Sequence, residues 1–255
     1  MSRGGGKSTA LSNGADRAQY VREMFGAISS RYDFLNHFLS AGLDLRWRRR
    51  AAAACCSALA QHSPRQTTPV VLDLCCGTGD LALAVLAQGA GRVVACDFSR
   101  PMLARAAAKF ARKGVADRTA LVEADALALP LPGGSVNAVT CGFGLRNLSD
   151  TARGLAEMMR VLVPGGAAVL LEFHQPRAGG PLAGTFGLYF RRILPRLGAW
   201  ISGGGHGGYQ YLVESIEAFG PPQATAAAME RAGFENVRIE PLTGGIASVY
   251  VGTKR

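Results

Sequence analysis

The chain has 255 residues, 48% of them hydrophobic and 18% charged, and a formal net charge of +10. This composition is typical of one globular domain with a sizeable core, and no apolar run reaches the roughly 18 residues that a membrane-spanning helix needs. Because the polar N-terminus also lacks an apolar signal region, the sequence argues against both an integral membrane protein and a secreted one.

The positive charge is concentrated in two segments. Residues 1–65 contain ten Lys and Arg against four Asp and Glu, and residues 176–206 contain four Arg and no acid, whereas the rest of the chain is balanced. Segments of this kind suit an anionic membrane surface or a nucleic acid, and a basic surface that serves only solubility is the plain alternative.

The chain begins with two segments of different character. Residues 1–19 are polar and rich in Gly and Ser, so we expect a disordered lead-in. A single domain then spans residues 20–255. Its first part, residues 20–60, is mostly helical by pattern with a break at residues 40–42, and we interpret it as a helical lid.

From residue 70 onward, short apolar runs alternate with helical stretches. Strands are expected at Val70–Cys75, Val93–Cys96, Ala120–Ala124, Val136–Cys141 and Ala167–Phe173, and helices at Asp80–Gln88, Pro101–Lys113 and Asp150–Leu162. A last helix, Gln223–Ala232, precedes two strands, Val237–Ile239 and Ile246–Val251, joined by a Gly-Gly turn. This order predicts an α/β fold in which helices cover both faces of a mostly parallel sheet.

The six cysteines form no C-x-x-C pair, and four of them lie in or beside apolar strands. No histidines are spaced to complete a zinc site with them. We therefore expect reduced core cysteines in a cytosolic protein, and no metal site.

The most informative run is VVLDLCCGTGD, residues 70–80, which is followed by an acidic residue at Asp97. Glycines in a turn after a strand let the backbone approach a ligand, and a carboxylate at the end of the next strand accepts hydrogen bonds from ribose hydroxyls. With Gly77 and Gly79, the turn fits a dinucleotide motif, G-x-G-x-x-A, which would make the protein an NAD-dependent oxidoreductase. With Asp73, it fits equally the D-x-x-x-G-x-G motif of class I S-adenosylmethionine methyltransferases.

Two downstream segments favour S-adenosylmethionine over NAD. The segment VEADALALPLP places Asp125 and Ala126 just after the third strand, and MMRVLVPGG joins a helix to a strand through Pro-Gly-Gly. Both resemble passages of class I methyltransferases, in which the first lies along the adenine. The resemblance implies a Rossmann-like sheet with an antiparallel last strand, and S-adenosylmethionine as methyl donor without a metal.

Four segments carry a narrower resemblance: RYDFLNHFLSAGLDLRWR (31–48), GFGLRNLSD (142–150), YQYLVESIEAF (209–219) and LTGGIASVYVG (242–252). In order and spacing they are similar to the ubiquinone/menaquinone biosynthesis C-methyltransferase family, from about Val21 to Lys254. Members methylate a ring carbon of a polyprenylated hydroquinone. The chain departs from the family pattern, in ways that bear on substrate preference, at Asp44, Val163, His174 and Val213.

The resemblance implies cofactor contacts for Asp73, Gly77, Thr78, Gly79, Asp97, Asp125, Ala126 and Gly142. Among these, Thr78 would contact the donor within the turn and Asp97 would bind the ribose. Asp125 and Ala126 would flank the adenine, and Gly142 stands where Ser is common. Asp73 would touch the methionine end, or alternatively only satisfy loop amides.

Two residues are candidates for the chemistry at the acceptor ring. A ring carbon becomes nucleophilic when a quinol hydroxyl loses its proton, so the protein must stabilise the developing phenolate. Arg146 suits that electrostatic role, because its pKa is too high for it to act as the base. Tyr32 is a second candidate, and the route of the proton stays open between a water and a neighbouring Tyr or His.

The acceptor itself is left open between demethylmenaquinol, which we favour, and 2-methoxy-6-polyprenyl-1,4-benzoquinol, or both. Residues 176–208 interleave apolar residues with Arg at helical spacing, which suits a substrate- and membrane-facing insertion and equally an ordinary lid helix. We expect a cytoplasmic enzyme bound peripherally to the anionic inner face of the cell membrane. A homo-oligomer is left open. A nucleic-acid partner is not expected, because the chain lacks the N-P-P-Y and Pro-Cys motifs of nucleic-acid methyltransferases.

Overall fold

The computed structural model describes residues 42–62, 68–174 and 215–255, and also residues 19, 23, 26, 33, 37 and 40. The amphipathic insertion expected at residues 176–208 and nearly all of the lead-in expected at residues 1–19 lie outside the described residues.

A single sheet forms the centre of the described chain, in the strand order β3-β2-β1-β4-β5-β7-β6. β7 runs antiparallel to β5 and β6, while β1 to β5 pair in parallel. This confirms the mostly parallel sheet with an antiparallel last strand. The strands are β1 (Val70–Leu74), β2 (Arg92–Asp97), β3 (Thr119–Glu123), β4 (Val136–Gly142), β5 (Leu162–Phe173), β6 (Glu235–Leu242) and β7 (Ala247–Thr253).

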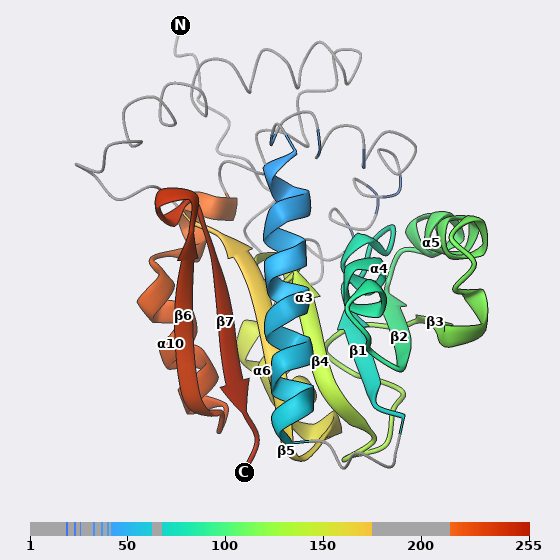
Figure 1. Cartoon of the computed structure of the whole chain (residues 1–255). Coiled ribbons are helices and arrows are strands. Elements are labelled where there is room, and N and C mark those ends of the chain that lie inside the picture. The colour runs from blue at the N-terminus through green and yellow to red at the C-terminus, as the bar shows by residue number, and fades with distance from the viewer. Residues whose placement is uncertain are drawn as a thin grey trace, which may run out of the picture.

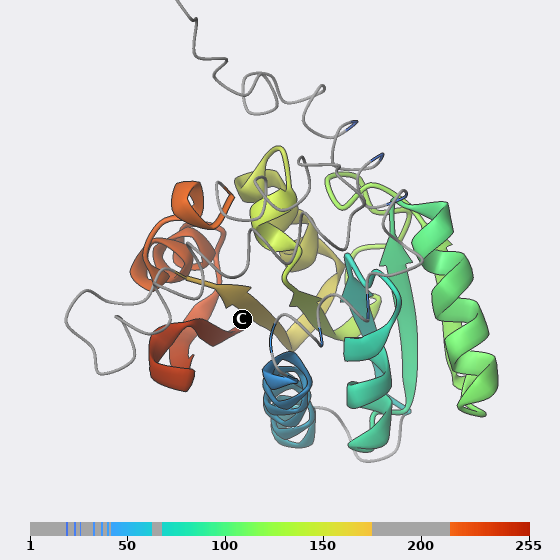
Figure 2. The ribbon, with the colours of Figure 1, turned by 90° about the horizontal axis from the view of Figure 1, so that it is seen from above.

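Helices cover both faces of this sheet, as the alternating sequence predicts (Figures 1 and 2). One layer consists of α3, α4 and α5, and the other of α6 and α10. The helices span Leu43–His62 (α3), Asp80–Ala87 (α4), Arg100–Arg112 (α5), Thr151–Val161 (α6) and Pro222–Arg231 (α10), and short 3-10 turns span Ala116–Arg118, Leu145–Asn147 and Thr243–Gly245.

Buried strand residues alternate between the two layers. Along β1, Val71 faces the layer of α3 to α5, whereas Leu72 and Leu74 face the layer of α6 and α10. Each is at most 1% exposed, and a fully buried aliphatic side chain of this size contributes about 1.5–3 kcal/mol. Burial on both faces explains why these strands read as continuous apolar runs.

The helix α3 occupies part of the segment interpreted as a lid. Its residues Ala51, Ala52 and Cys55 are fully buried, and Trp47 is 4% exposed and stacks edge-on against Phe173. Residues 43–62 therefore form a structural layer on the sheet (Figure 1). The apolar stripe of this helix is made mostly of Ala and Cys, which explains how an Arg-rich sequence can lie against the core.

The expected element boundaries agree with the structure to within about two residues for most elements. β6 ends three residues beyond the expected Ile239, and β5 differs most, because it begins at Leu162 rather than at Ala167. Leu162 pairs with Val136, and the register then shifts before Ala138 pairs with Ala167. The Pro-Gly-Gly turn predicted between α6 and the strand is thus a bulge inside the strand, with Gly165 at a φ of 78°.

The strand order creates one natural place for a ligand. From β1 the chain moves to β2 and β3 on one side, and then returns to β4 and β5 on the other. The connections after β1 and β4 therefore diverge at the carboxyl edge of the sheet, and such a switch point leaves a crevice where ligands bind in open α/β sheets. Among the described helices, none has the length and apolar character that crossing a bilayer requires.

Candidate functional site

A cavity opens at this switch point, at the carboxyl ends of β1, β2 and β4. It is lined by the turn after β1, by Asp97 at the end of β2, by Asp125 and Ala126 after β3, and by the loop after β4. Its lining residues include Leu74, Cys75, Gly77, Cys96, Asp97, Phe98, Met102, Asp125, Ala126, Gly142, Phe143 and Asn147. Most of the predicted cofactor residues are thus brought to one place.

Glycine is required at the two positions of the turn, Gly77 and Gly79, for different physical reasons. Gly77 has a φ of 55°, and its amide donates a 2.8 Å hydrogen bond to Oδ2 of Asp97. Gly79 has a φ of 85°, and a Cβ there would lie 2.5 Å from the ring of Phe110. Gly77 therefore joins the turn to the cavity wall, while Gly79 allows α5 to pack closely against the start of α4.

Asp97 is 7% exposed and lines the cavity. Burial raises the pKa of its carboxyl above the ordinary value, and backbone donors from Ser99, Gly77 and Phe98 act in the opposite direction. The amide of Ser99 is 2.9 Å from Oδ1. The carboxylate is therefore fixed in place from the protein side, while its residue forms part of the cavity wall.

Residues after β3 and at the end of β4 complete the lining of the cavity. Asp125 is exposed and accepts a hydrogen bond from the amide of Leu127, and Ala126 is 6% exposed. A Cβ at Gly142 would lie 3.0 Å from Cδ2 of Leu81. A larger residue at Gly142 would thus require Leu81 of α4 to move.

A second cavity adjoins the first and shares Cys75, Gly77 and Gly142 with it. Arg48 and Asp73 contribute buried charged side chains to its wall, and Thr78 and Asp80 lie there too. Neither the second cavity nor Arg48 had been anticipated from the sequence.

Asp73 is a buried carboxyl in the wall of this second cavity. It is 1% exposed, and its Oδ1 accepts a 2.8 Å hydrogen bond from Thr140. The backbone of Ala82 also stabilises its charged form, but its buried Oδ2 lacks a partner with full hydrogen-bond geometry among the described residues. Burial raises the pKa of this carboxyl to about 7. An unsatisfied carboxylate oxygen in a cavity is suited to a bound cation such as an ammonium group. These residues fit the zwitterionic methionine end of S-adenosylmethionine.

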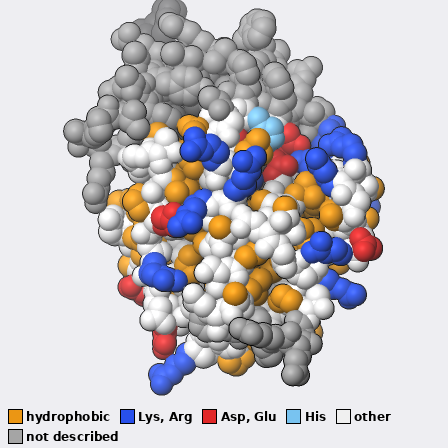
Figure 3. Space-filling model, viewed as in Figure 1, with side chains coloured by type: hydrophobic (Ala, Val, Ile, Leu, Met, Phe, Trp, Pro, Cys, Tyr) orange, Lys and Arg blue, Asp and Glu red, His pale blue; other side chains and the backbone are white. Residues whose placement is uncertain are grey.

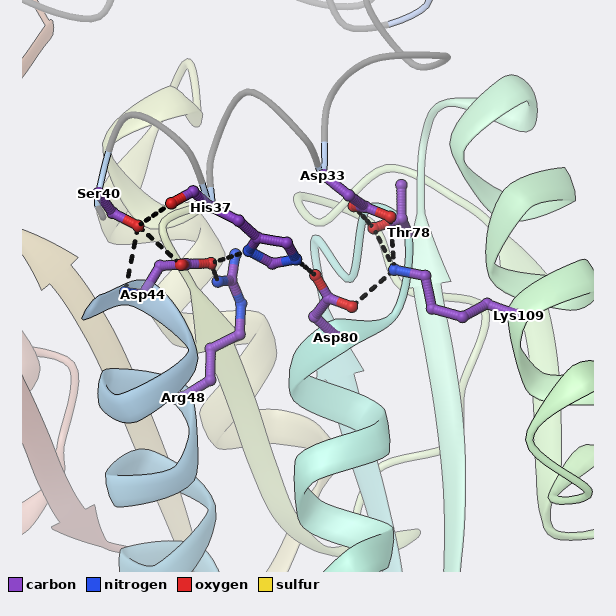
Figure 4. A network of polar contacts seen from close by, with 8 residues as sticks. All are labelled: Asp33, His37, Ser40, Asp44, Arg48, Thr78, Asp80 and Lys109. Atoms are coloured by element: carbon purple, nitrogen blue, oxygen red, sulfur yellow. Dashed lines mark hydrogen bonds and ion pairs between the residues drawn. The ribbon is translucent and has the colours of Figure 1, made fainter. Parts of the chain in front are cut away.

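Thr78 and Asp80 belong to a polar network above this cavity (Figure 4). The hydroxyl of Thr78 donates to Asp33 at 2.5 Å, and Nζ of Lys109 lies 2.7 Å from Asp33 and 2.6 Å from Asp80. Burial raises the pKa of Asp33, but the bonds from Lys109 and Thr78 and the charge of Lys109 outweigh it, so the net pKa is lowered. Lys109 thus joins the N-terminal segment to α4 and α5.

The same network continues to α3 through a histidine. Nδ1 of His37 lies 2.8 Å from Asp44, and its Nε2 lies 3.7 Å from Asp80. Ser40 donates to the second oxygen of Asp44 at 2.7 Å, and Arg48 pairs with Asp44 from the next turn of the helix. Of the N-terminal motif, Asp33 therefore contacts the turn at Thr78, whereas His37 lies between Asp44 and Asp80 and Ser40 faces Asp44 at the start of α3 (Figure 4).

Arg146 lies in the 3-10 turn after β4, behind the cavity wall. Its side chain is 6% exposed, and Nη1 donates to Glu172 at 2.5 Å and to the carbonyl of Phe143 at 2.7 Å. Glu172 is fully buried at the end of β5 and also accepts from the amides of Arg146 and Phe173. Arg146 was predicted from the sequence as a functional residue, whereas its carboxylate partner Glu172 was not.

The remaining candidates divide between buried and undescribed positions. Tyr32 lies outside the described residues. His174 is 3% exposed and its Nε2 is 2.5 Å from the hydroxyl of Tyr250, and burial lowers the pKa of this imidazole. Each of the six cysteines is free, and no group of three His, Cys, Asp or Glu within the described part of the chain is arranged to hold a metal.

Of the residues that the structure describes, those on the face that α3 covers form no single basic patch. Their Lys and Arg side chains are spread in small groups among polar and apolar ones, and acidic side chains and a histidine lie in the upper part of the described surface (Figure 3). The described residues of this face therefore do not form the basic surface that docking to an anionic membrane would use.

Known proteins resemble this chain in sequence and in fold. The model of the ubiE/COQ5 methyltransferase family matches residues 14–254. A protein of Deinococcus radiodurans named demethylmenaquinone methyltransferase is 48% identical over 94% of this chain and 95% of its own length. A protein of Geobacter sulfurreducens named ubiquinone/menaquinone biosynthesis C-methyltransferase is 39% identical over 94% of this chain and 90% of its own length.

Solved methyltransferase structures share the fold of this chain. The crystal structure of an S-adenosylmethionine-dependent methyltransferase from Aquifex aeolicus superposes with a TM-score of 0.54 at 17% identity, covering 78% of this chain and 89% of that one. That likeness shows the class I methyltransferase fold, while the match over nearly the whole sequence decides the family. With the cavity, the fold and the sequence in agreement, the chain belongs to the ubiE/COQ5 methyltransferase family.

Proposed function

We propose that this protein transfers a methyl group from S-adenosylmethionine to a ring carbon of demethylmenaquinol. The observation that carries the proposal is the 48% identity, over 94% of the chain, to a relative named demethylmenaquinone methyltransferase. The cavity at the switch point and the unsatisfied Asp73 beside it support the choice of methyl donor.

In this proposal the first cavity holds the adenosine. Asp97, fixed by the amides of Gly77 and Ser99, accepts from the ribose hydroxyls, and Asp125 and Ala126 lie along the adenine. The second cavity holds the methionine end, with the ammonium group at Asp73 and with Thr78 in its wall. Gly142 lines both cavities, and its lack of a side chain leaves room for the part of the cofactor that joins the adenosine to the methionine end.

S-adenosylmethionine supplies the methyl group, and the acceptor ring carbon gives up a proton in exchange. The acceptor is the reduced quinol, since an oxidised quinone is an electrophile. The protein must hold the ring carbon in line with the methyl group and stabilise the phenolate that drives the transfer. A positive charge near the ring lowers the pKa of a quinol hydroxyl.

Arg146 remains our proposed source of that charge, acting on the ring from behind the loop of Phe143 and Asn147. Its ion pair with Glu172 holds the guanidinium in one orientation, but it also offsets part of the charge. Tyr32 remains a proposed second residue at the ring. The proton acceptor stays open between a water and a neighbouring Tyr or His.

The benzoquinol of ubiquinone biosynthesis is the second candidate acceptor, favoured by the relative whose name covers both pathways. A polyprenylated acceptor resides in the bilayer, so we also propose a cytoplasmic enzyme bound peripherally to the membrane through its basic segments, residues 1–65 and 176–206. A homo-oligomer stays open.

Mass spectrometry of the quinones in cells that lack this protein tests the proposal. Accumulation of a demethylated naphthoquinone, reversed by the wild-type gene, is the expected result. Accumulation of a demethylated benzoquinone alone would transfer the assignment to the ubiquinone pathway, and an unchanged quinone pool would refute both. Co-sedimentation with anionic vesicles, lost in high salt, tests the membrane proposal separately.

A further inference from the structure

The second cavity contains a buried arginine, Arg48, to which the proposed methyl transfer assigns no role. Arg48 lies on the second turn of α3, is 7% exposed, and forms part of the wall of the cavity that contains Asp73. Its charge is close enough to act on the carboxyl of Asp73, whose pKa it lowers against the larger opposing effect of burial. One small cavity thus presents a buried cation and a buried anion.

The ion pair of Arg48 and Asp44 is far more buried than the intrahelical pair of Arg160 and Glu157. Arg48 and Asp44 are i, i+4 neighbours with side chains only 8% and 3% exposed, whereas the i, i+3 pair of Arg160 and Glu157 is 39% and 17% exposed. Burying an ion pair costs desolvation energy that the attraction often fails to recover, so such a pair is weak evidence for a purely stabilising role. A role toward a ligand accounts for the burial.

The guanidinium of Arg48 is also held rigidly. Nη1 donates to Asp44, and the planar group lies over the ring of Phe143 with Cζ 5.2 Å from the ring centroid. A guanidinium carries five N–H donors in a fixed fork, and the bond from Nη1 to Asp44 uses one of them. Arg48 is therefore held in place, and its remaining N–H groups are available to a ligand in the cavity without a change of side-chain conformation.

Asp44 is fixed in turn by the N-terminal segment. It accepts from Ser40 and lies 2.8 Å from Nδ1 of His37. Burial raises the pKa of Asp44, but the charge of Arg48, the bond from Ser40 and the proximity of His37 outweigh it, so the net pKa is lowered. Asp44 is therefore an ionised positioning residue that holds Arg48 in place.

We infer that Arg48 binds the α-carboxylate of the methionine end of the methyl donor, opposite the ammonium group held at Asp73. This inference rests on the proposed function and deepens it, because it assigns both charges of the amino-acid group to named residues. The adenosine moiety in the first cavity and this zwitterion in the second are then joined beside Gly142, which lines both cavities.

Three ligands that differ in this group test the inference on the full chain. S-adenosylhomocysteine carries both charges, S-adenosyl-3-thiopropylamine lacks only the carboxylate, and 5′-methylthioadenosine lacks both. Isothermal titration calorimetry of the wild-type protein should show S-adenosylhomocysteine binding about 10- to 100-fold more tightly than the thiopropylamine, the range for a charged hydrogen bond. Equal affinities would overturn the inference without any variant.

Arg48→Gln should remove this preference while leaving the affinity for the thiopropylamine within about threefold of wild type. The matched control is Arg50→Gln. Arg50 lies two residues further along the same helix and pairs with Glu240 at the surface, so this variant should keep the preference for S-adenosylhomocysteine. If Arg48→Gln weakens all three ligands alike, the residue only shapes the cavity and the inference fails. If wild type binds none of the three, the cofactor assignment fails and this inference fails with it.

Discussion

The buried pair of Arg146 and Glu172 allows a structural role to be separated from a catalytic one. Replacing Arg146 by Met removes the 2.5 Å bond to Glu172 and the 2.7 Å bond to the carbonyl of Phe143. It leaves a fully buried carboxylate without its cation, which costs about 3–5 kcal/mol for a broken buried pair. At about 2–4 °C per kcal/mol for a domain of this size, the melting temperature should fall by about 6–20 °C.

The double variant Arg146→Met, Glu172→Leu should recover most of that loss, because replacing both charges by apolar groups removes the uncompensated carboxylate. Calorimetric melting of the two single variants and the double variant completes the cycle. A loss below about 1 kcal/mol in Arg146→Met would refute the reasoning about the pair.

The double variant also tests the proposed electrostatic role. If Arg146 stabilises the phenolate, a folded double variant that still binds S-adenosylhomocysteine should have lost turnover by about 100-fold or more, as for loss of an oxyanion-stabilising donor. Wild-type turnover in that variant would remove Arg146 from the chemistry and leave it a structural residue. The recovered fold is what makes the rate interpretable.

Three further perturbations test other parts of the site. The pKa of Asp73 in the folded protein, about 7, lies above its unfolded value, so the folded protein retains a proton between about pH 4 and 7 and its stability falls as pH rises. The melting temperature of Asp73→Asn should therefore rise relative to that of wild type as pH increases over this window. The affinity for S-adenosylhomocysteine should increase through pH 7 in wild type only. Lys109→Met should weaken cofactor binding through the loss of its bonds to Asp33 and Thr78, measured by titration calorimetry, and an unchanged affinity would show that the network has no role in binding. Gly79→Ala should destabilise the fold by about 1–3 kcal/mol in denaturant melts, because the new Cβ would overlap Phe110, and a neutral effect would contradict the packing reason given for this glycine.

The fold and the residues of the first cavity, which we propose holds the adenosine, were predictable because their signals are local. Buried parallel strands read as continuous apolar runs, and a turn such as that of Gly77 sits next to the strand that presents it. The end of β2 then supplies Asp97 at a fixed sequence distance. Each of these features is recognisable within about 30 residues, the size of one βαβ unit.

The second cavity, which we propose holds the methionine end, was less predictable because its residues meet only through tertiary packing. Arg48 is one of several arginines in α3, and nothing in its local sequence marks it as the one that turns inward. Lys109 joins Asp33 and Asp80, which lie 76 and 29 residues away in the chain. Glu172 did leave a usable signal, since a carboxylate inside the apolar run AAVLLEF of a buried strand requires a partner.

The most direct test of the central claim is to follow the methyl group in vitro. The purified protein is given S-adenosylmethionine with a ¹³C-labelled methyl group and demethylmenaquinol kept reduced in vesicles, and the quinones are analysed by mass spectrometry and NMR. We predict menaquinol that carries the label in the methyl group on its ring carbon, with one S-adenosylhomocysteine formed per label transferred. A folded protein that binds S-adenosylhomocysteine but leaves the naphthoquinol unlabelled, or labels one of its oxygens, would contradict the account.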